Sequence, residues 1–368
     1  MNIQERLEEA WFAASGADPA TVRTIHPGDE LLLWEQRLGR PSDELRATYM
    51  RSGHDTLRYV EDALRQAGRP LGKSRRVLEF ASGFGRVTRH LVRVVDPKHV
   101  WTSEILEGAD KFSAANFGVH GVGSAAAPEE LPLEGEFDLI FVVSLFSHLP
   151  QTTFARFLGA LYERLSDDGV LLFSTHGPAV VPDVALDARG FGYDTGSESL
   201  ALSGDEYGTT AVTIPRVGEF AEAVGVRHLA SLERGLWGFQ DLFAASKQPL
   251  PGLDAWKHAP IPRGSIERCH FEGGNVEIGG WVRLPADAGS IARTTLVMDD
   301  GARRVDAELV PYERPLVEAE GGAAMRQTDW FVAGPLGEAA PGKHSVAAVV
   351  ETTEGARGCI GVVPLDVD

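Results

Sequence analysis

The chain has 368 residues, of which 43% are hydrophobic and 24% are charged, and its formal net charge is −18. This composition is typical of a globular protein that is long enough for two domains. The negative charge argues against a nucleic acid or an anionic membrane as the main partner, because both present phosphate groups that bind basic surfaces.

The cysteines, the acidic residues and the N-terminus give further expectations about disulfides, metals and cell compartment. The two cysteines, Cys269 and Cys359, support neither a disulfide framework nor a zinc site. The acids Asp183, Asp187 and Asp194 match no metal-binding pattern, so we expect no metal. The N-terminus lacks a signal-peptide pattern, and no apolar run of about 18 residues occurs. We therefore expect a cytoplasmic protein, and its Ala-, Gly- and Arg-rich composition is typical of bacteria.

The first part of the chain, residues 1–70, is predicted to be helical. Apolar residues recur there at helical spacing, as in the stripe formed by Leu7, Ala10, Trp11 and Ala14. We expect such stripes to serve mainly as core packing.

The stretch that organises the chain is 75–91, which reads RRVLEFASGFGRVTRHL. Val77–Phe80 predicts a buried strand, because it is a short apolar run. Ala81–Gly85 then turns the chain, and glycine there permits positive φ and close approach of a ligand to the backbone. From Arg86 onward, apolar residues return at helical spacing and predict a helix. Strand, tight turn and helix form the first unit of a doubly wound nucleotide-binding sheet.

The next apolar run, residues 99–103, ends at Glu104, an acid that lies roughly 20 residues past the turn. An acid at this place can accept hydrogen bonds from the two ribose hydroxyls of an adenosine-containing cofactor. A dinucleotide-binding protein would need a further glycine three residues beyond Gly85, where Thr88 stands.

This stretch resembles motif I of class I S-adenosylmethionine-dependent methyltransferases, in which an acid precedes G-x-G-x-G. The likeness is closest to a branch in which Arg follows the last glycine, as Arg86 follows Gly85. Ala81 stands where the family usually has its first glycine, and alanine disfavours positive φ. The resemblance implies S-adenosyl-L-methionine as cofactor. It implies that the cofactor-binding residues are Glu79, Ala81, Gly83, Gly85, Arg86, Glu104 and Ser144. Arg86 could steer the cofactor carboxylate or cap the helix region.

Strands and helices alternate from Arg75 to Lys247, which predicts βαβ units and a largely parallel sheet. Gly169 is expected to cap the C-terminus of the helix before it. A long insertion, residues 177–215, leaves the carboxyl edge of the sheet, where ligands bind. After Glu104 we expect strands at 118–122, 137–143 and 170–174, helices at 106–116, 154–165 and 217–224, and a closing hairpin at 228–232 and 239–245.

Two histidines follow central strands at the same edge, His148 after the fourth strand and His176 after the fifth. A histidine there can take the proton from a hydroxyl as that hydroxyl is methylated. His148 is the preferred catalytic candidate, because the resembling family often has His, Asn or Asp after its fourth strand. His148 could equally hold its loop through a hydrogen bond, and a structural role is favoured for His176. Asp241 could orient a base or the closing strands.

The last part of the chain changes character. Prolines and glycines gather in residues 249–265 and predict a linker. From residue 266 to 368, short alternating runs are separated by Gly, Pro and Asp turns, so we expect an antiparallel β-sandwich. Gly280–Val282 and Tyr312–Pro315 resemble features of β-sandwich modules attached to bacterial transferases of surface-polysaccharide loci.

The expected fold class is α/β. It comprises a doubly wound, Rossmann-like methyltransferase sheet with an N-terminal helical segment, plus a C-terminal antiparallel β-sandwich domain. The expected domains are a helical lid at 1–70, which in the family often covers the cofactor, a cofactor-binding domain at 71–248, the linker at 249–265 and the sandwich at 266–368.

The resemblance implies methyl transfer from S-adenosylmethionine, with a sugar or another small hydroxylated acceptor related to surface polysaccharides as the expected substrate. Two alternatives stay open. A natural-product methyltransferase would share all of the cofactor motifs, and a degenerate, non-catalytic binding protein would explain Ala81 as the trace of a lost site. We expect a small molecule or glycan as partner, and neither a nucleic acid nor a membrane, with the oligomeric state open.

Overall fold

The computed structural model describes residues 2–197, 199, 201–299, 303–311, 325–335 and 341–367. They group into two compact units. Unit 1 comprises Met1–Thr21, Leu31–Asp55 and His258–Asp368, and unit 2 comprises Val22–Glu30 and Thr56–Lys257. The grouping places most of the N-terminal residues with the C-terminal ones, whereas the domain boundaries at residues 70, 248 and 265 stay a prediction.

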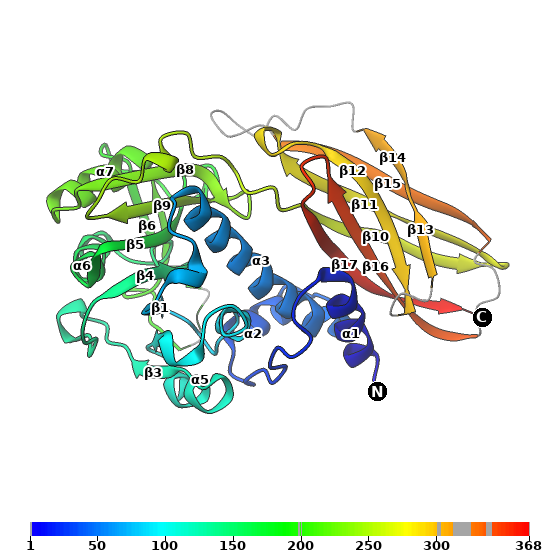
Figure 1. Cartoon of the computed structure of the whole chain (residues 1–368), viewed down its shortest axis with the longest axis horizontal. Coiled ribbons are helices and arrows are strands. Elements are labelled where there is room, and N and C mark those ends of the chain that lie inside the picture. Colours follow the sequence, from blue (N-terminus) through cyan, green and yellow to red (C-terminus); the bar gives the residue numbers. More distant parts are fainter. Residues whose placement is uncertain are drawn as a thin grey trace. The chain divides into compact units, whose positions relative to one another are not determined.

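Unit 2 is built on a seven-stranded sheet in the order β3-β2-β1-β4-β5-β9-β8 (Figure 1). Strands β1 to β5 run parallel, while β9 is antiparallel to both of its neighbours. The strands are β1 Val77–Phe80, β2 Val100–Glu104, β3 His120–Gly123, β4 Phe137–Val142, β5 Leu165–His176, β8 His228–Leu236 and β9 Gln240–Ser246. The predicted Rossmann-like sheet with a closing hairpin is confirmed.

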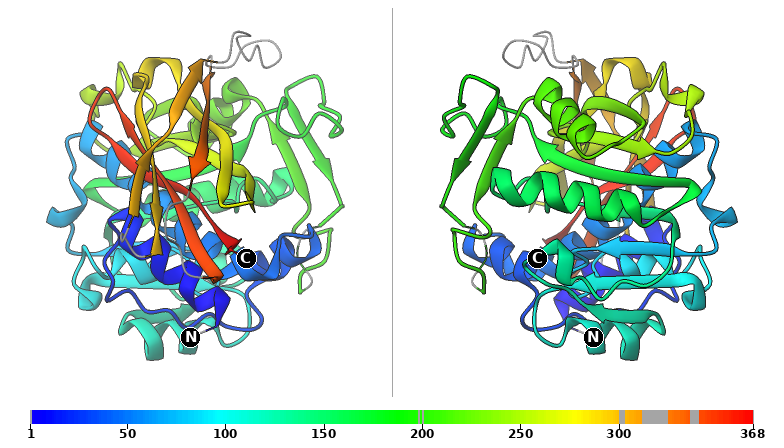
Figure 2. Two further views of the ribbon diagram at one scale, coloured as in Figure 1. Left: turned by 90° about the vertical axis from the view of Figure 1, so that its right-hand side faces the viewer. Right: turned by 90° about the vertical axis from the view of Figure 1, so that its left-hand side faces the viewer.

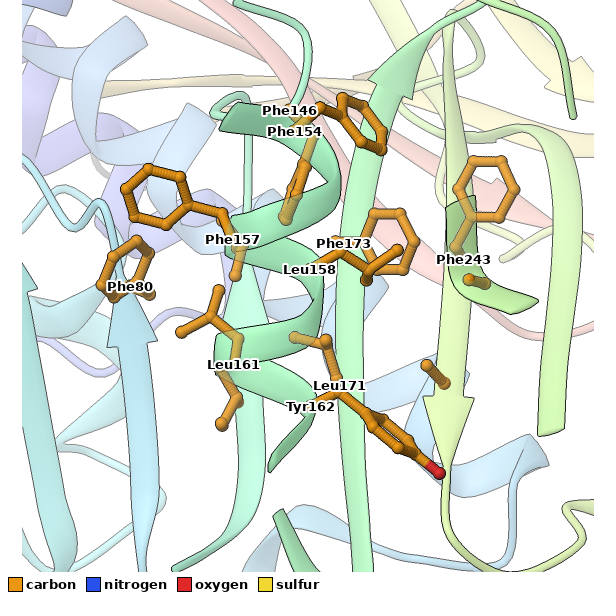
Figure 3. Close-up of a cluster of buried hydrophobic side chains, with 14 of the residues drawn as sticks. Phe80, Phe146, Phe154, Phe157, Leu158, Leu161, Tyr162, Leu171, Phe173 and Phe243 are labelled. Atoms are coloured by element: carbon orange, nitrogen blue, oxygen red, sulfur yellow. The ribbon is translucent and has the colours of Figure 1, made fainter. Parts of the chain in front are cut away.

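Helix α6 (Gln151–Glu163) supplies a large part of the core of this unit. Its apolar positions recur every three to four residues, which gives the helix one face that packs on the sheet. Figure 3 shows Phe157, Leu158 and Leu161 directed from α6 toward the strands. The ring centroid of Phe157 lies 5.9 Å from that of Phe80 on β1. Further helices of unit 2 are α4 Thr88–Leu91, α5 Ala109–Phe117 and α7 Ile214–Ala223.

One local prediction was wrong, and one predicted helix is present but short. Gly169 is not a helix cap, because α6 ends at Glu163 and β5 begins at Leu165. The register with β4 jumps between residues 165 and 170, so Gly169 lies in a bulge where a Cβ would stand 2.6 Å from the carbonyl oxygen of Phe137. The helix expected from Arg86 is short, since tight turns whose hydrogen bonds span three residues follow α4.

The insertion after β5 forms a separate two-stranded hairpin, β6 (Phe191–Asp194) and β7 (Thr209–Val212). It stands at one margin of unit 2 in both views of Figure 2. The hairpin is tied to the loop that follows β4, because the amides of Gly208 and Thr210 donate to the carbonyl oxygens of His148 and Ser147 at 3.0 and 2.8 Å. The insertion therefore borders the carboxyl end of β4.

The C-terminal strands of unit 1 form two antiparallel sheets, β10-β11-β15-β14 and β13-β12-β16-β17. The strands are β10 Arg263–Glu272, β11 Asn275–Pro285, β12 Ile291–Met298, β13 Arg303–Asp306, β14 Glu308–Pro311, β15 Met325–Pro335, β16 Gly342–Thr352 and β17 Arg357–Val367. Side chains from both sheets, such as Val282, Trp330 and Val346, share one apolar core, which confirms the predicted β-sandwich. Tyr312–Pro315 lies outside the described residues.

The predicted N-terminal helical segment comprises α1 Ile3–Ser15, α2 Glu30–Arg37 and α3 Leu45–Gln66. Asn2 caps the N-terminus of helix α1, because its side chain accepts from the amide of Glu5, and the helix packs against β16 and β17. Its face buries the stripe predicted from the sequence, with Leu7 and Trp11 fully buried. Among the described residues, no helix is long and apolar enough to cross a membrane.

Candidate functional site

The turn between β1 and α4 has the backbone geometry that its small residues permit. Ala81, Gly83 and Gly85 all have positive φ, at 58°, 55° and 79°. A Cβ on Gly85 would stand 2.2 Å from the ring of Phe117, so this position also requires glycine for packing. Around Gly83 a Cβ would meet nothing within 4 Å beyond its own chain neighbours. The turn is therefore packed on one side and open at Gly83.

Ala81 keeps the left-handed conformation even though it carries a side chain. Left-handed backbone costs an L-residue roughly 1–2 kcal/mol, and here the amide of Ala81 donates to the carbonyl oxygen of Ser103 at 2.8 Å. The surrounding hydrogen bonds hold the alanine in the shape that a glycine would adopt more easily. The substitution thus leaves the path of the turn intact.

Glu104, at the end of β2, is brought directly to this turn. Its carboxylate accepts from the amide of Gly83 at 2.7 Å and from those of Ile105 and Leu106 at 2.8 and 3.1 Å. The side chain is buried, and burial raises the pKa of this carboxyl, while the three amide hydrogen bonds act in the opposite direction. Glu104 therefore fixes the position of the turn and leaves further oxygen lone pairs for hydroxyl donors.

Glu79 lies inside the protein under the turn. Its carboxylate accepts from the hydroxyl of Thr88 at 2.6 Å, which ties β1 to the first residue of α4. Burial raises the pKa of Glu79 to about 7, although the Thr88 hydrogen bond and the guanidinium of Arg86 lower it. The sequence did not predict this role of Thr88. There, Thr88 served only to show that the third glycine of a dinucleotide-binding motif is missing.

Arg86 points away from the helix that it precedes. Its guanidinium donates to the hydroxyl of Thr56 at 3.1 Å and lies 5.7 Å from the ring centroid of Trp237. These partners come from α3 and from the turn before β9. Arg86 therefore joins two distant segments of unit 2, and its role toward a cofactor stays a prediction.

Residues Val22–Glu30 cover the other side of the turn, a contact that the sequence did not predict. Arg89 is fully buried and donates to the carbonyl oxygens of Gly85 at 3.0 Å and of Val22 and Thr24 at 2.9 Å. The ring of His26 stacks on Phe84 with centroids 3.9 Å apart. The sequence around Arg89 also contains Arg86, His90 and Arg93, so no local pattern marks Arg89 as the buried arginine.

His148 is buried in the loop after β4. Its Nδ1 lies 2.7 Å from the carbonyl oxygen of Gly208, and its ring stacks on Tyr207 with centroids 4.4 Å apart. Because a carbonyl can only accept, Nδ1 is protonated, and the neutral form of this ring therefore has its lone pair on Nε2. This contact is the loop-holding hydrogen bond considered from the sequence, and it also gives the tautomer that a general base needs at Nε2.

His176 ends β5 next to His148, with ring centroids 5.8 Å apart. The side-chain amide of Gln240 donates to the hydroxyl of Ser144 and to Nε2 of His176, each at 3.1 Å. Burial, together with nearby His148, lowers the pKa of His176 to about 4, so the ring is neutral at pH 7. With Nε2 accepting, its proton sits on Nδ1. His176 is thus a poor base, and Gln240, which fixes its tautomer, was not predicted as a site residue.

Residues 52–203 match the model of a family described as "Methyltransferase domain". Residues 52–203 carry a methyltransferase domain. This match confirms the predicted methyltransferase domain. Comparison with curated protein sequences gives no match.

Solved structures with a likeness to the methyltransferase domain include "PigF with SAH", with 16% identity and TM-score 0.38, over 50% of this chain and 54% of that chain. The DhpI-SAH complex has 18% identity and TM-score 0.35, over 61% of this chain and 100% of the other. The 1,6-didemethyltoxoflavin-N1-methyltransferase of Burkholderia thailandensis has 18% identity and TM-score 0.38, over 61% and 92%. The chain thus spans about half the length of the first of these proteins, and at these TM-scores the likenesses carry no functional argument.

The methyltransferase domain gathers the predicted residues in two groups. Glu79, Ala81, Gly83, Gly85, Arg86 and Glu104 belong to the turn or contact its residues. Ser144, His148 and His176 form a second group with Gln240 and Tyr207, at the carboxyl ends of β4 and β5. Asp241 lies beside this second group on β9, where its carboxylate accepts from the amide of Arg234 at 2.8 Å.

Proposed function

We propose that the chain transfers a methyl group from S-adenosylmethionine to a hydroxyl of a sugar or another small hydroxylated acceptor, with His148 as general base. The observation that carries the proposal is the hydrogen bond from Nδ1 of His148 to the carbonyl oxygen of Gly208. It orients a basic Nε2 at the carboxyl edge of the sheet, which is the edge where the glycine turn and Glu104 also lie. We also propose that the protein is bacterial and acts in the cytoplasm.

The turn fits the cofactor chemically. Gly83 leaves open space where a side chain would otherwise stand, and Glu104 has carboxylate lone pairs suited to ribose hydroxyls. Gly83, Gly85 and Glu104 would hold the cofactor, with Glu79 and Ala81 shaping the turn beneath it. When bound, S-adenosylmethionine supplies a methyl group on a positively charged sulfur, which an oxygen nucleophile can attack.

The histidine group would manage the acceptor's proton. A hydroxyl that gains a methyl group loses a proton, and Nε2 of His148 would take it while Gly208 stabilises the charged ring through Nδ1. His176 stays neutral beside it, so it does not repel the positive charge that forms on His148. Gln240, which also donates to Ser144, donates to Nε2 of His176 and so orients this ring.

The two alternatives differ in what supports them. Ala81 retains positive φ, which favours a working turn over a degenerate binding protein. A natural-product acceptor remains compatible with the same residues. Part of the lid expected at residues 1–70 lies near the turn. Val22 accepts from Arg89, and Thr56 accepts from Arg86.

The test is calorimetric titration of S-adenosylmethionine and S-adenosylhomocysteine into the full chain and two variants. Gly83→Leu should weaken binding at least tenfold, because its side chain would fill the open space (about 1.4 kcal/mol per tenfold). Gly225→Leu is the matched control, since Gly225 also has positive φ with nothing within 4 Å of its Cβ, at the C-terminus of α7. Equal binding by all three proteins would refute the pocket. Transfer of labelled methyl groups to sugars and small phenols then identifies the acceptor class.

A further inference from the structure

A charged depression of about 260 Å³ lies on one face of the sheet β13-β12-β16-β17 in unit 1. Thr295 on β12 pairs with Asp306 on β13 and with Val349 on β16, so these three side chains share a face. Their neighbours Leu296 and Ala348 point to the other face and belong to the sandwich core. The depression therefore opens on the face of this sheet that is opposite to the sandwich core.

The floor of the depression is apolar. Val297 and Val349 line it, yet their exposed fractions are only 5% and 3% although they lie on the outer face. Longer polar side chains around them stand above this floor. The depression is thus a shallow site with an apolar bottom and a charged rim, near the lower end of the volumes of small-molecule sites (about 300 Å³).

The rim carries three guanidinium groups and two carboxylates. Arg293 pairs with Glu351 at 2.6 Å, and the hydroxyl of Thr295 donates to Asp306 at 2.7 Å, so both carboxylates are held in place. Arg304 on β13 and Arg357 on β17 complete the rim from opposite sides. The local excess is one positive charge, in a chain whose net charge is −18.

This combination selects a ligand with one negative charge and several hydroxyls. Guanidinium groups bind carboxylates through paired hydrogen bonds, whereas the carboxylates of Glu351 and Asp306 would repel a phosphate dianion. The same two carboxylates are strong acceptors for hydroxyl donors, and the apolar floor suits the C–H face of a sugar ring. We propose that the depression binds a saccharide that carries a carboxylate, such as a uronic acid unit. Such a site is independent of methyl transfer and would hold an acidic glycan on the sandwich.

The test uses the full chain and isothermal titration with three probes: trigalacturonate, the neutral trisaccharide maltotriose, and inorganic phosphate. Trigalacturonate should bind at least tenfold more tightly than maltotriose, and Arg304→Gln and Arg357→Gln should each weaken it about tenfold. Arg326→Gln is the matched control, because Arg326 is an exposed arginine on β15 in the other sheet. Its affinity should equal that of the wild type. Melting temperatures of all variants establish that they are folded.

Each other outcome overturns the proposal. Equal affinity for trigalacturonate and maltotriose would remove the role of the carboxylate. Phosphate that binds as tightly as trigalacturonate and displaces it would reduce the depression to a simple anion site. Absence of binding, or the same loss in Arg326→Gln as in the rim variants, would show that the depression is a solvated face of the sheet. None of these outcomes tests cofactor binding by the methyltransferase domain, because the depression and the cofactor turn are formed by different residues.

Discussion

Replacing Glu79 with glutamine should stabilise the protein above pH 7 and change little at low pH. Glu79 is 4% exposed, and its burial raises the pKa from 4.5 to about 7. A carboxyl with a raised pKa in the folded state favours folding when it is protonated. Its contribution is therefore fully present below pH 4.5 and is lost as the pH rises through about 7. A glutamine is neutral at every pH and avoids this loss.

The magnitude follows from the size of the shift. A change from 4.5 to about 7 corresponds to about 3 kcal/mol of destabilisation at pH 8 in the wild type. The variant does not regain all of this free energy of unfolding. The hydroxyl of Thr88 donates to a carboxylate in the wild type and to an amide oxygen, a weaker acceptor, in the variant. We expect Glu79→Gln to gain about 2 kcal/mol over the wild type at pH 8 and much less at pH 5.

Differential scanning calorimetry at pH 5 and pH 8 measures this gain, because it can separate the transitions of two units. Glu136→Gln serves as the control, since Glu136 is an exposed residue just before β4 in the same unit. It should change stability equally at both pH values. If Glu79→Gln shows the same difference from wild type at pH 5 and pH 8, the raised pKa is refuted.

Three further predictions concern the turn and the histidine group. His148→Ala should lower turnover at saturating cofactor at least about 100-fold with cofactor affinity unchanged, and equal turnover would remove it as the base. Gly85→Ala should cost about 2–3 kcal/mol in calorimetric unfolding, because it adds a steric clash to backbone strain, whereas Gly83→Ala should cost only about 1 kcal/mol; equal costs would contradict the packing. Gln240→Leu should convert the single Nδ1-protonated tautomer of His176 into a mixture, read from imidazole ¹⁵N chemical shifts, and an unchanged spectrum would refute the amide's role.

The sequence was sufficient wherever a local pattern determines the structure. The run before Ala81 predicted β1, and the run before Glu104 predicted β2, because buried parallel strands are short and continuously apolar. Since neighbouring parallel strands end at the same edge, the sequence alone predicts that the turn and Glu104 lie together. At the level of one residue, Gly83 was expected to permit positive φ in the turn, and its φ is 55°.

The sequence was insufficient where the partner lies far along the chain. Arg89 meets Val22 and Thr24 over more than 60 positions, and no periodicity encodes such a pairing. Gly169 was assigned to a helix end because glycine is common there, but the register of β5 on β4 decided its role. Gln240 gained its importance only from the fold, which sets β9 beside β5.

The buried guanidinium of Arg89 has a consequence for the smallest piece of the chain that can fold by itself. Residues 52–203, which match the methyltransferase family, lack the backbone carbonyls of Val22 and Thr24. A fragment cut to that match would leave a fully buried cation without two of its acceptors, and breaking such pairing costs about 3–5 kcal/mol, a large share of a domain's total stability. It would also lack β9 and with it Gln240. The autonomous folding unit is therefore longer than the segment that matches the family model, and it includes residue 22.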